Sequence, residues 1–283
     1  MPFLTDCNTL YPGSRKNALE HLECAWENGF TPLSVGCPVI IADGLKGTDD
    51  IGVPVCGGEY IKEAKIGRAI MDADIFISLT HFKGHETTGF GGAIKNIGMG
   101  CGSRAGKKDQ HNNGKPQIDP EKCRGCRVCM RECANHGLIY DEANHKMTIN
   151  QENCVGCGRC IGACNFDAIE FSNWAAAKDL NCRMAEYAKA VVDGRPSFHI
   201  SLIVDVSPNC DCHPENDVPM VPDVGMFASF DPVALDLACA EAVNRQPVLP
   251  NSAITDQKHE HDCDRFHAVH DNTHWQDLIE HGK

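Results

Sequence analysis

The sequence lacks a hydrophobic run long enough to cross a membrane, because no 18 consecutive apolar residues occur in it. It is also poor in basic residues, with 26 Lys and Arg against 39 Asp and Glu, which gives a formal net charge of −13. General nucleic-acid binding is therefore disfavoured, since neutralising phosphates requires clustered basic side chains. Residues 1–10 contain no basic region followed by an apolar stretch, so we expect no secretory signal and a cytoplasmic protein.

Cysteine, by contrast, is abundant, with 18 cysteines in 283 residues. The length fits one large domain or two ordinary ones, and 42% hydrophobic residues are enough to build a core. In a small secreted domain so many cysteines would indicate disulfides. Their spacing here follows a different logic.

Two copies of one cysteine motif, C-x2-C-x2-C-x3-C, lie 31 positions apart. The first copy comprises Cys123, Cys126, Cys129 and Cys133, and the second comprises Cys154, Cys157, Cys160 and Cys164. The same shift aligns Ile118 with Ile149 and Leu138 with Ile169. We infer that a whole unit of strand, ligand loop and strand is duplicated.

The spacing itself predicts iron–sulfur ligation. Two-residue gaps turn the backbone tightly enough for three thiolates to face one cubane, and the fourth thiolate comes from the other repeat. One [4Fe–4S] cluster is accordingly assigned to Cys123, Cys126, Cys129 and Cys164, and the second to Cys154, Cys157, Cys160 and Cys133. From 118 to 171 the chain resembles bacterial two-cluster ferredoxins, although Ala134 and Asn165 replace the proline that usually follows the fourth cysteine.

A zinc site or a set of buried thiols is the alternative interpretation of these motifs. Zinc sites typically pair two distant C-x2-C units, and a tetrahedral zinc ion needs only four ligands in all. Two sets of four cysteines, each within 11 residues, therefore favour clusters over zinc.

The sequence on both sides of the motifs alternates between helix and strand signals, which favours a parallel or mixed sheet with crossover helices. Strands are expected at 38–43, 75–80 and 199–206. Helices are expected from an N-cap at Ser14 to Gly29, around Ile66, Ala69 and Ile70, over 174–192, and after Asp231 and Pro232. We predict a discontinuous α/β domain (1–117 and 173–283) with a ferredoxin-like α+β module inserted at 118–172.

A second group of chemistry-bearing residues lies before the motifs. Residues 83–108 hold five basic residues and one acid, a local charge of +4, around a glycine-rich loop. Gly91, Gly92 and Lys95 are candidate ligands for an anion, because glycines let backbone amides approach a phosphate or carboxylate. The pattern matches neither a P-loop nor a dinucleotide fingerprint, and glycines that merely shape a tight loop explain it equally well.

Cys210 and Cys212 follow a predicted strand, where ligands tend to bind in α/β sheets, and Cys101 follows the glycine-rich loop. If these segments converge, the three thiols form a third site for a metal, a cluster with an open iron, or a redox pair. Ordinary buried thiols are slightly favoured. The cysteines without ligand spacing are interpreted as structural: Cys7, Cys24, Cys37, Cys56, Cys182, Cys239 and Cys263. The histidines of the tail, from His259 to His281, suggest a solvated polar face more than a metal site.

Seven segments taken together carry a family resemblance. They are 6–15, 81–85, 89–101, the two cysteine motifs, 210–212 and 229–234. With them the chain resembles the domain-of-unknown-function 362 family of iron–sulfur proteins over nearly its whole length. The resemblance implies an α/β domain with a two-cluster insert, and it defines no reaction.

Three functions are compared. Electron transfer leads, because two adjacent clusters exchange single electrons and the acidic surface would steer a redox protein partner. The alternative is a reductase that holds an anionic small molecule or a flavin at the glycine-rich loop, with His81, Lys83, His85 and Lys95 as candidate catalytic residues. The third is a scaffold with structural clusters. Oligomerisation stays open.

Overall fold

The computed structural model of the 283-residue chain contains two compact units, which are described separately. Unit 1 comprises Met1–Ile51, Lys65–Ala69 and Gly102–Ala176, and unit 2 comprises Gly52–Ala64, Ile70–Cys101 and Ala177–Lys283. The structure describes residues 1–10, 14–15, 17–111, 115–131, 133, 136–154, 160, 164, 166, 168–171, 177–212, 217–256, 263–271 and 273–283. The predicted domain boundaries at 118 and 172 stay a prediction.

Unit 1 opens with a parallel pair of short strands, β1 (Leu4–Asp6) and β2 (Val39–Ile41). Two helices connect them, α1 (Ala18–Glu27) and α2 (Pro32–Val35). The predicted N-cap at Ser14 is wrong, because the side chain of Asn17 accepts the amides of Leu19 and Glu20. Beyond them, α5 (Arg104–Gln110) begins at Ser103, whose Oγ accepts the amide of Gly106.

The cysteine-rich part of unit 1 is built from two antiparallel strand pairs. β8 (Pro116–Ile118) pairs with β11 (Ile169–Phe171), and β9 (Leu138–Asp141) pairs with β10 (Lys146–Ile149). A short helix, α6 (Val128–Arg131), carries Cys129. Each strand is only three or four residues long, so this part has little sheet of its own.

A helix was expected around Ile66, Ala69 and Ile70, but Ile66 belongs to a strand. β3 (Asp50–Pro54) pairs with β4 (Glu63–Gly67), and α3 (Arg68–Met71) starts only after β4 ends. Ile66 also forms an antiparallel bridge with Gly102, and the amide of Ser103 donates to the Lys65 carbonyl at 3.0 Å. This distant pairing overrides the helical spacing of the apolar residues.

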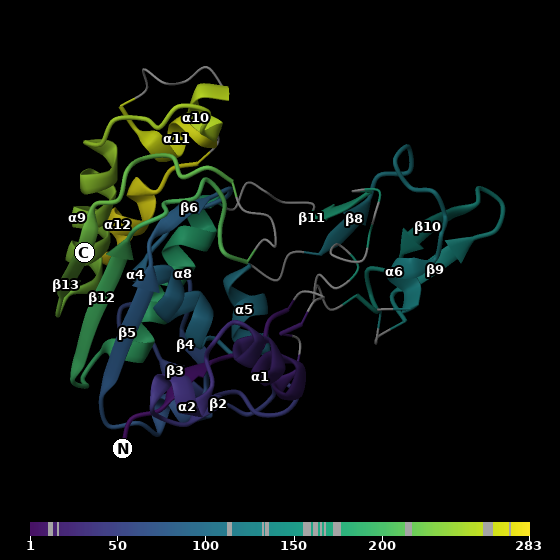
Figure 1. The fold of residues 1–283 in the computed structure, drawn as a ribbon. Coiled ribbons are helices and arrows are strands. Elements are labelled where there is room, and N and C mark those ends of the chain that lie inside the picture. Colours follow the sequence, from purple (N-terminus) through teal and green to yellow (C-terminus); the bar gives the residue numbers. More distant parts are fainter. Residues whose placement is uncertain are drawn as a thin grey trace. The chain divides into compact units, whose positions relative to one another are not determined.

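The central sheet of unit 2 has the order β13-β12-β5 (Figure 1). β12 (Ser197–Ile203) runs parallel to β5 (Phe76–His81) and antiparallel to β13 (Gly225–Ser229). β12 lies between the other two and alternates buried with half-buried residues along most of its length. The expected strands at 75–80 and 199–206 thus correspond to β5 and β12, within a few residues at each end.

Helices complete unit 2. α8 (Ala177–Val192) packs against α12 (Gln276–Gly282) and against the π-helix η1 (Asn96–Gly100). α9 (Pro232–Asn244) begins as predicted, with Asp231 as N-cap and Pro232 in its first turn. The tail adds α10 (Ala253–Asp256) and α11 (Arg265–Val269). Phe82, Phe90 and Phe266 are buried together, with ring centroids 4.9–6.0 Å apart.

A glycine-rich hairpin precedes η1 in unit 2. β6 (Lys83–His85) pairs with β7 (Gly89–Gly91), and α4 (Ala93–Lys95) follows at once and continues into η1. The expected α/β fold is confirmed, as an assembly of small parallel and antiparallel sheets with helices. Among the described residues, no helix combines the length and the apolar character that a membrane crossing requires.

Candidate metal centre

The strand pairs around the cysteine motifs follow the shift of 31 residues. In one pair Ile118 faces Ile169, and in the other Leu138 faces Ile149. The shift of 31 residues relates Ile118 of the first pair to Ile149 of the second, and Leu138 of the second pair to Ile169 of the first. The two pairs therefore consist of equivalent residues of the two repeats. The two halves therefore pair with each other through matching residues.

Backbone hydrogen bonds repeat in the same register. The amide of Cys123 donates to the Asp119 carbonyl and that of Cys154 to the Asn150 carbonyl, both at 3.0 Å. The amide of Asp119 donates to the Ala168 carbonyl, as that of Asn150 does to the carbonyl of Gly137, both at 2.8 Å. The first cysteine of each motif is thus held by the same backbone geometry.

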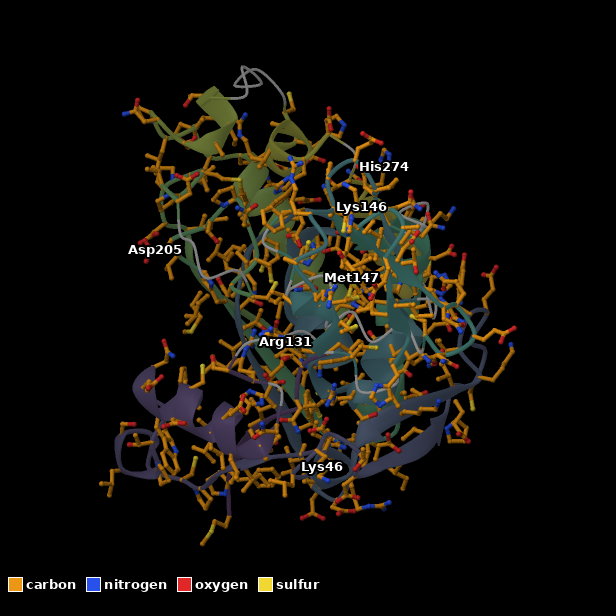
Figure 2. The ribbon with its side chains drawn as sticks, turned by 90° about the vertical axis from the view of Figure 1, so that its right-hand side faces the viewer. Lys46, Arg131, Lys146, Met147, Asp205 and His274 are labelled. Atoms are coloured by element: carbon orange, nitrogen blue, oxygen red, sulfur yellow. The ribbon has the colours of Figure 1, made fainter. Side chains whose placement is uncertain are left out.

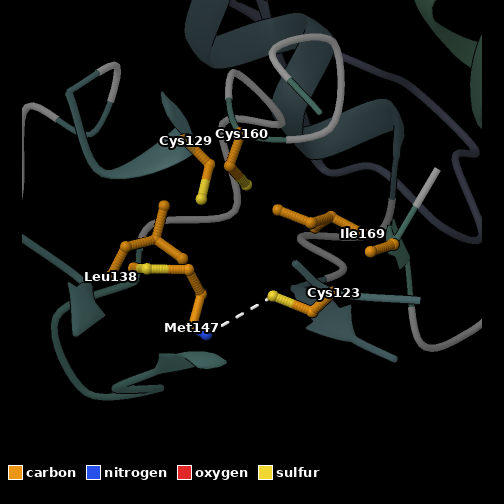
Figure 3. Packing of buried hydrophobic residues seen from close by; sticks show 7 residues of the cluster. Cys123, Cys129, Leu138, Met147, Cys160 and Ile169 are labelled. Atoms are coloured by element: carbon orange, nitrogen blue, oxygen red, sulfur yellow. Dashed lines mark hydrogen bonds between the residues drawn. The ribbon is translucent and has the colours of Figure 1, made fainter. Parts of the chain in front are cut away.

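Several cysteine sulfurs accept backbone amides, again in matched positions. Gly137 N donates to Cys133 Sγ at 3.2 Å, and its image Ala168 N donates to Cys164 Sγ at 3.4 Å. Met147 N donates a hydrogen bond to Cys123 Sγ at 3.4 Å, which is the dashed line in Figure 3. Met147 follows Lys146 on β10, and both residues are labelled in Figure 2. Amides aimed at sulfur stabilise thiolates and the ligand sulfurs of metal centres.

Cys129 lies within electrostatic reach of three further thiols. The pKa of Cys129 is raised to about 11, mainly by burial and then by the negative charges of Cys126, Cys164 and Cys123. Two of these neighbours belong to the motif of Cys129, and Cys164 comes from the other motif. This set is the group that the exchanged fourth ligand predicts.

The second predicted set is only partly described. Cys160 is buried, Cys133 and Cys154 are half-buried, and Cys157 lies outside the described residues. Cys160 is the image of Cys129, and Figure 3 shows both side chains pointing toward the other buried residues of this set. Both third cysteines of the motifs therefore occupy the interior of this part of unit 1.

The thiols fit a soft metal centre by their chemistry. Four neighbouring thiols, two of which accept backbone amides at their sulfurs, suit zinc or an iron–sulfur cluster better than the hard cations, which prefer oxygen. The buried set here contains three cysteines among seven residues: Cys123, Cys129, Leu138, Met147, Cys160, Ala168 and Ile169. So much sulfur in so small a core is expected where a metal centre supplies part of the interior.

In the glycine-rich loop of unit 2, the backbone amides donate to a side chain of the protein itself, the carboxyl group of Asp236 on α9. Ala93 N donates to Asp236 Oδ1 at 2.7 Å and Ile94 N to Asp236 Oδ2 at 2.9 Å, so the first amides of α4 are occupied. A Cβ at Gly92 would lie 2.3 Å from Asp236 Oδ1, which explains this glycine. These contacts favour the structural interpretation of the loop, and an external anion at Gly91, Gly92 and Lys95 stays a prediction.

We expect Asp236→Ala to destabilise the protein by about 2–4 kcal/mol, because two buried amides lose their acceptor. Burial raises the pKa of Asp236 to about 7, against the two amide bonds that lower it. The matched control is Glu241→Ala on the same helix, which removes only an exposed ion pair with Arg245 and should cost about 0.5 kcal/mol or less. Urea unfolding of both variants at pH 7 measures the difference, and equal losses would contradict the role of Asp236.

Lys95 and Lys83 point to partners on the segment after β12. Lys95 Nζ donates to Cys210 Sγ at 2.9 Å, and Lys83 Nζ lies 3.3 Å from Asp211 Oδ2. Both lysines are buried or nearly so, and Gly91 leaves them room, since a Cβ there would approach Lys83 Cε at 3.1 Å. Of the basic residues that the sequence showed around this loop, Lys83 and Lys95 are thus paired within unit 2.

His81 joins the same network as a doubly protonated ring. Its Nδ1 lies 2.9 Å from Asp211 Oδ2 and its Nε2 lies 2.8 Å from the Val204 carbonyl. A carbonyl and an ionised carboxylate only accept, so both ring nitrogens donate. The hydrogen bond to Asp211 accordingly raises the pKa of His81, although burial opposes it.

Of the predicted third site, the structure brings together Cys210 and Cys212 and adds His85. One ligand atom from each of the three lies within 4.8 Å of the others. Cys101 is buried, is not a member of this group, and has its Sγ 4.0 Å from the Asn96 carbonyl. Asp211 and Asp236 were missed as functional residues; an aspartate between Leu235 and Leu237 in an apolar helix was the available signal for Asp236.

The remaining cysteines and the tail histidines differ in environment. Cys7, Cys182 and Cys239 are buried, and Cys56 and Cys263 are exposed. Of the tail, His259 and His261 lie outside the described residues. His281 Nε2 lies 2.9 Å from Glu186 Oε1, and His270 Nε2 donates to the Pro208 carbonyl at 3.0 Å. These two histidines serve the packing of unit 2.

Comparison with known families gives one match. The family described as "Domain of unknown function (DUF362)" matches residues 1–241. The comparison with curated proteins gives no match.

Proposed function

The chain belongs to the DUF362 family, and from that premise we propose that it is an iron–sulfur electron-transfer protein with two [4Fe–4S] clusters. Membership by itself supplies no reaction, so the proposal rests on the cysteines. Cys123, Cys126, Cys129 and Cys164 would hold one cluster. The second would be held by Cys133, Cys154, Cys157 and Cys160.

The neighbourhood of Cys129 is the observation that carries the proposal. Its thiol interacts with Cys123 and Cys126 of its own motif and with Cys164 of the other. In two-cluster ferredoxins each repeat supplies the fourth cysteine ligand of the other repeat's cluster. A structural zinc ion needs only four ligands and does not require a second, matching set of four cysteines. The matched hydrogen bonds of the two repeats support the same interpretation.

The chain's own groups would tune such a centre. When bound, a [4Fe–4S] cluster supplies one-electron oxidation and reduction. The amides of Gly125 and Met147 donate to Cys123 Sγ, and that of Ala168 donates to Cys164 Sγ, so they stabilise negative charge on the ligand sulfurs and favour the reduced state. The net charge of −13 would direct a basic surface of a redox protein partner toward this chain.

Anaerobic purification with metal and sulfide analysis tests the proposal. We expect about eight iron and about eight sulfide per chain, and an EPR signal of interacting clusters after reduction. The reduced protein should pass electrons reversibly to a one-electron dye. Zinc in place of iron and sulfide would show a zinc protein, and iron that cannot be reduced and reoxidised would leave only a structural role.

A further inference from the structure

Unit 2 contains a pair of thiols that the proposed clusters do not use. The sulfurs of Cys210 and Cys212 lie within 4.8 Å of each other and of one ring nitrogen of His85. Cys210 is buried and Cys212 is exposed. Small molecules can therefore approach Cys212 from solvent, while Cys210 is shielded.

The loop that carries the two thiols is fixed in place. Gly84 N donates to the Ser207 carbonyl at 2.8 Å, and Ser207 Oγ donates to the Asn209 carbonyl at 2.8 Å. A Cβ at Gly84 would lie 2.2 Å from the Pro208 carbonyl oxygen, so only glycine allows β6 to approach the loop this closely. The position of the thiols is thus set by backbone contacts.

The hydrogen bonds of His85 disfavour a metal at this place. His85 Nδ1 accepts the amides of Thr87 at 3.0 Å and Thr88 at 3.2 Å. In the neutral ring the proton then sits on Nε2, so one nitrogen is an acceptor and the other an N–H donor. A metal would have to displace either the two amides or the proton, whereas an N–H group suits a neighbouring thiolate.

The charges around the pair stabilise one thiolate. Lys95 Nζ donates to Cys210 Sγ at 2.9 Å, which places an ammonium group where a cationic metal would have to bind. The hydrogen bond with Cys212 is the largest of the causes that lower the pKa of Cys210, and Lys95 and Lys83 lower it further against the effect of burial; the resulting pKa is about 4. The pKa of Cys212 is raised mainly by the same hydrogen bond. The two sulfurs therefore share a single proton at neutral pH.

We propose that Cys210 and Cys212 form a redox-active dithiol that reduces a small disulfide. The Cys210 thiolate takes the proton of Cys212 as the exposed Cys212 Sγ attacks one sulfur of the disulfide R–S–S–R, forming a mixed disulfide and releasing RS⁻. Released RS⁻ takes the proton of Cys210, and Cys210 then attacks Cys212 Sγ, forming the Cys210–Cys212 disulfide and expelling the second RS⁻. The dithiol loses two electrons and the substrate gains them.

The proposal is independent of the clusters and is tested on the anaerobic, iron-loaded full chain with glutathione disulfide as the probe. Alkylation followed by peptide mass spectrometry should show the peptide with Cys210 and Cys212 losing two hydrogens. Exposed Cys263 is the matched control and should stay reduced over the same time. In Cys210→Ser we expect a glutathione adduct that persists on Cys212, because no second thiol resolves it. Iron content is measured in parallel and should not change.

Lys95→Met provides a second readout that does not depend on a ligand. Without the ammonium group the pKa of the thiolate should rise, and once it exceeds 6.5, alkylation by iodoacetamide at pH 6.5 should slow about tenfold for each further unit. Rates for Cys263 should not change. Oxidation at Cys263 as fast as at the pair would overturn the proposal. So would one zinc ion per chain that stays bound in the wild type and is lost in Cys212→Ser, since that result identifies a metal site.

Discussion

In a Cys164→Ser variant, we expect alkylation to reach Cys123, Cys126 and Cys129, more than 30 residues earlier in the chain, while Cys154 and Cys160 of the mutated motif stay protected. The reason is the crossed assignment that we propose: Cys164 interacts with Cys129, so its loss would open the cluster assigned to the first motif. Iron should fall from about eight to about four per chain. Peptide mass spectrometry after anaerobic alkylation identifies which cysteines react.

The mirror variant and a neutral variant control this experiment. Cys133→Ser should expose Cys154, Cys157 and Cys160 and leave the other set protected. Cys24→Ser removes a half-buried thiol of α1 outside both motifs and should leave iron unchanged. If Cys164→Ser instead exposes the second motif, each motif binds its own four-cysteine cluster and the crossed assignment is wrong.

The cysteine spacing alone leads to the ligand sets that we propose, because the constraint is local and chemical. Three cysteines two residues apart can face one centre only through a tight turn, and the repeat then supplies the fourth. The start of α9 was equally predictable, since Asp231 and Pro232 act on the adjacent helical turn. Such features depend on residues that are neighbours in the sequence.

Partners separated by long stretches of sequence could not be predicted in this way. The carboxylate of Asp236 accepts the amides of Ala93 and Ile94, which are 143 and 142 residues earlier in the sequence. Lys95 donates to Cys210, which is 115 residues later. From the sequence, an anion site and a merely shaped loop therefore explained the glycines equally well, because the sequence does not reveal that the Asp236 carboxylate accepts two amides of this loop. Ile66 is a similar case, because its antiparallel bridge with Gly102, 36 residues later, favours a strand over the helix that the local sequence predicted.

The largest expected effect of removing the metal is a loss of structure confined to the cysteine-rich strands. Their strands are three or four residues long, and the buried set around them has only four members that are not cysteine. Without iron, crowded thiolates would repel one another and little apolar area would compensate. We expect amides of β8–β11 to exchange about a hundredfold faster or more after chelation, which corresponds to about 2.7 kcal/mol.

Strand β12 of unit 2 supplies the internal control for hydrogen exchange. It is paired on both sides, by β5 and β13, and Ile203 at its end is fully buried, so its protection does not depend on the cysteine motifs. Its amides should exchange at the same rate with and without iron. Unchanged protection in β8–β11 would show that this part folds without a metal, and the cysteines would then be poor candidates for its core. Loss of protection in β12 as well would show that the two compact units unfold as one.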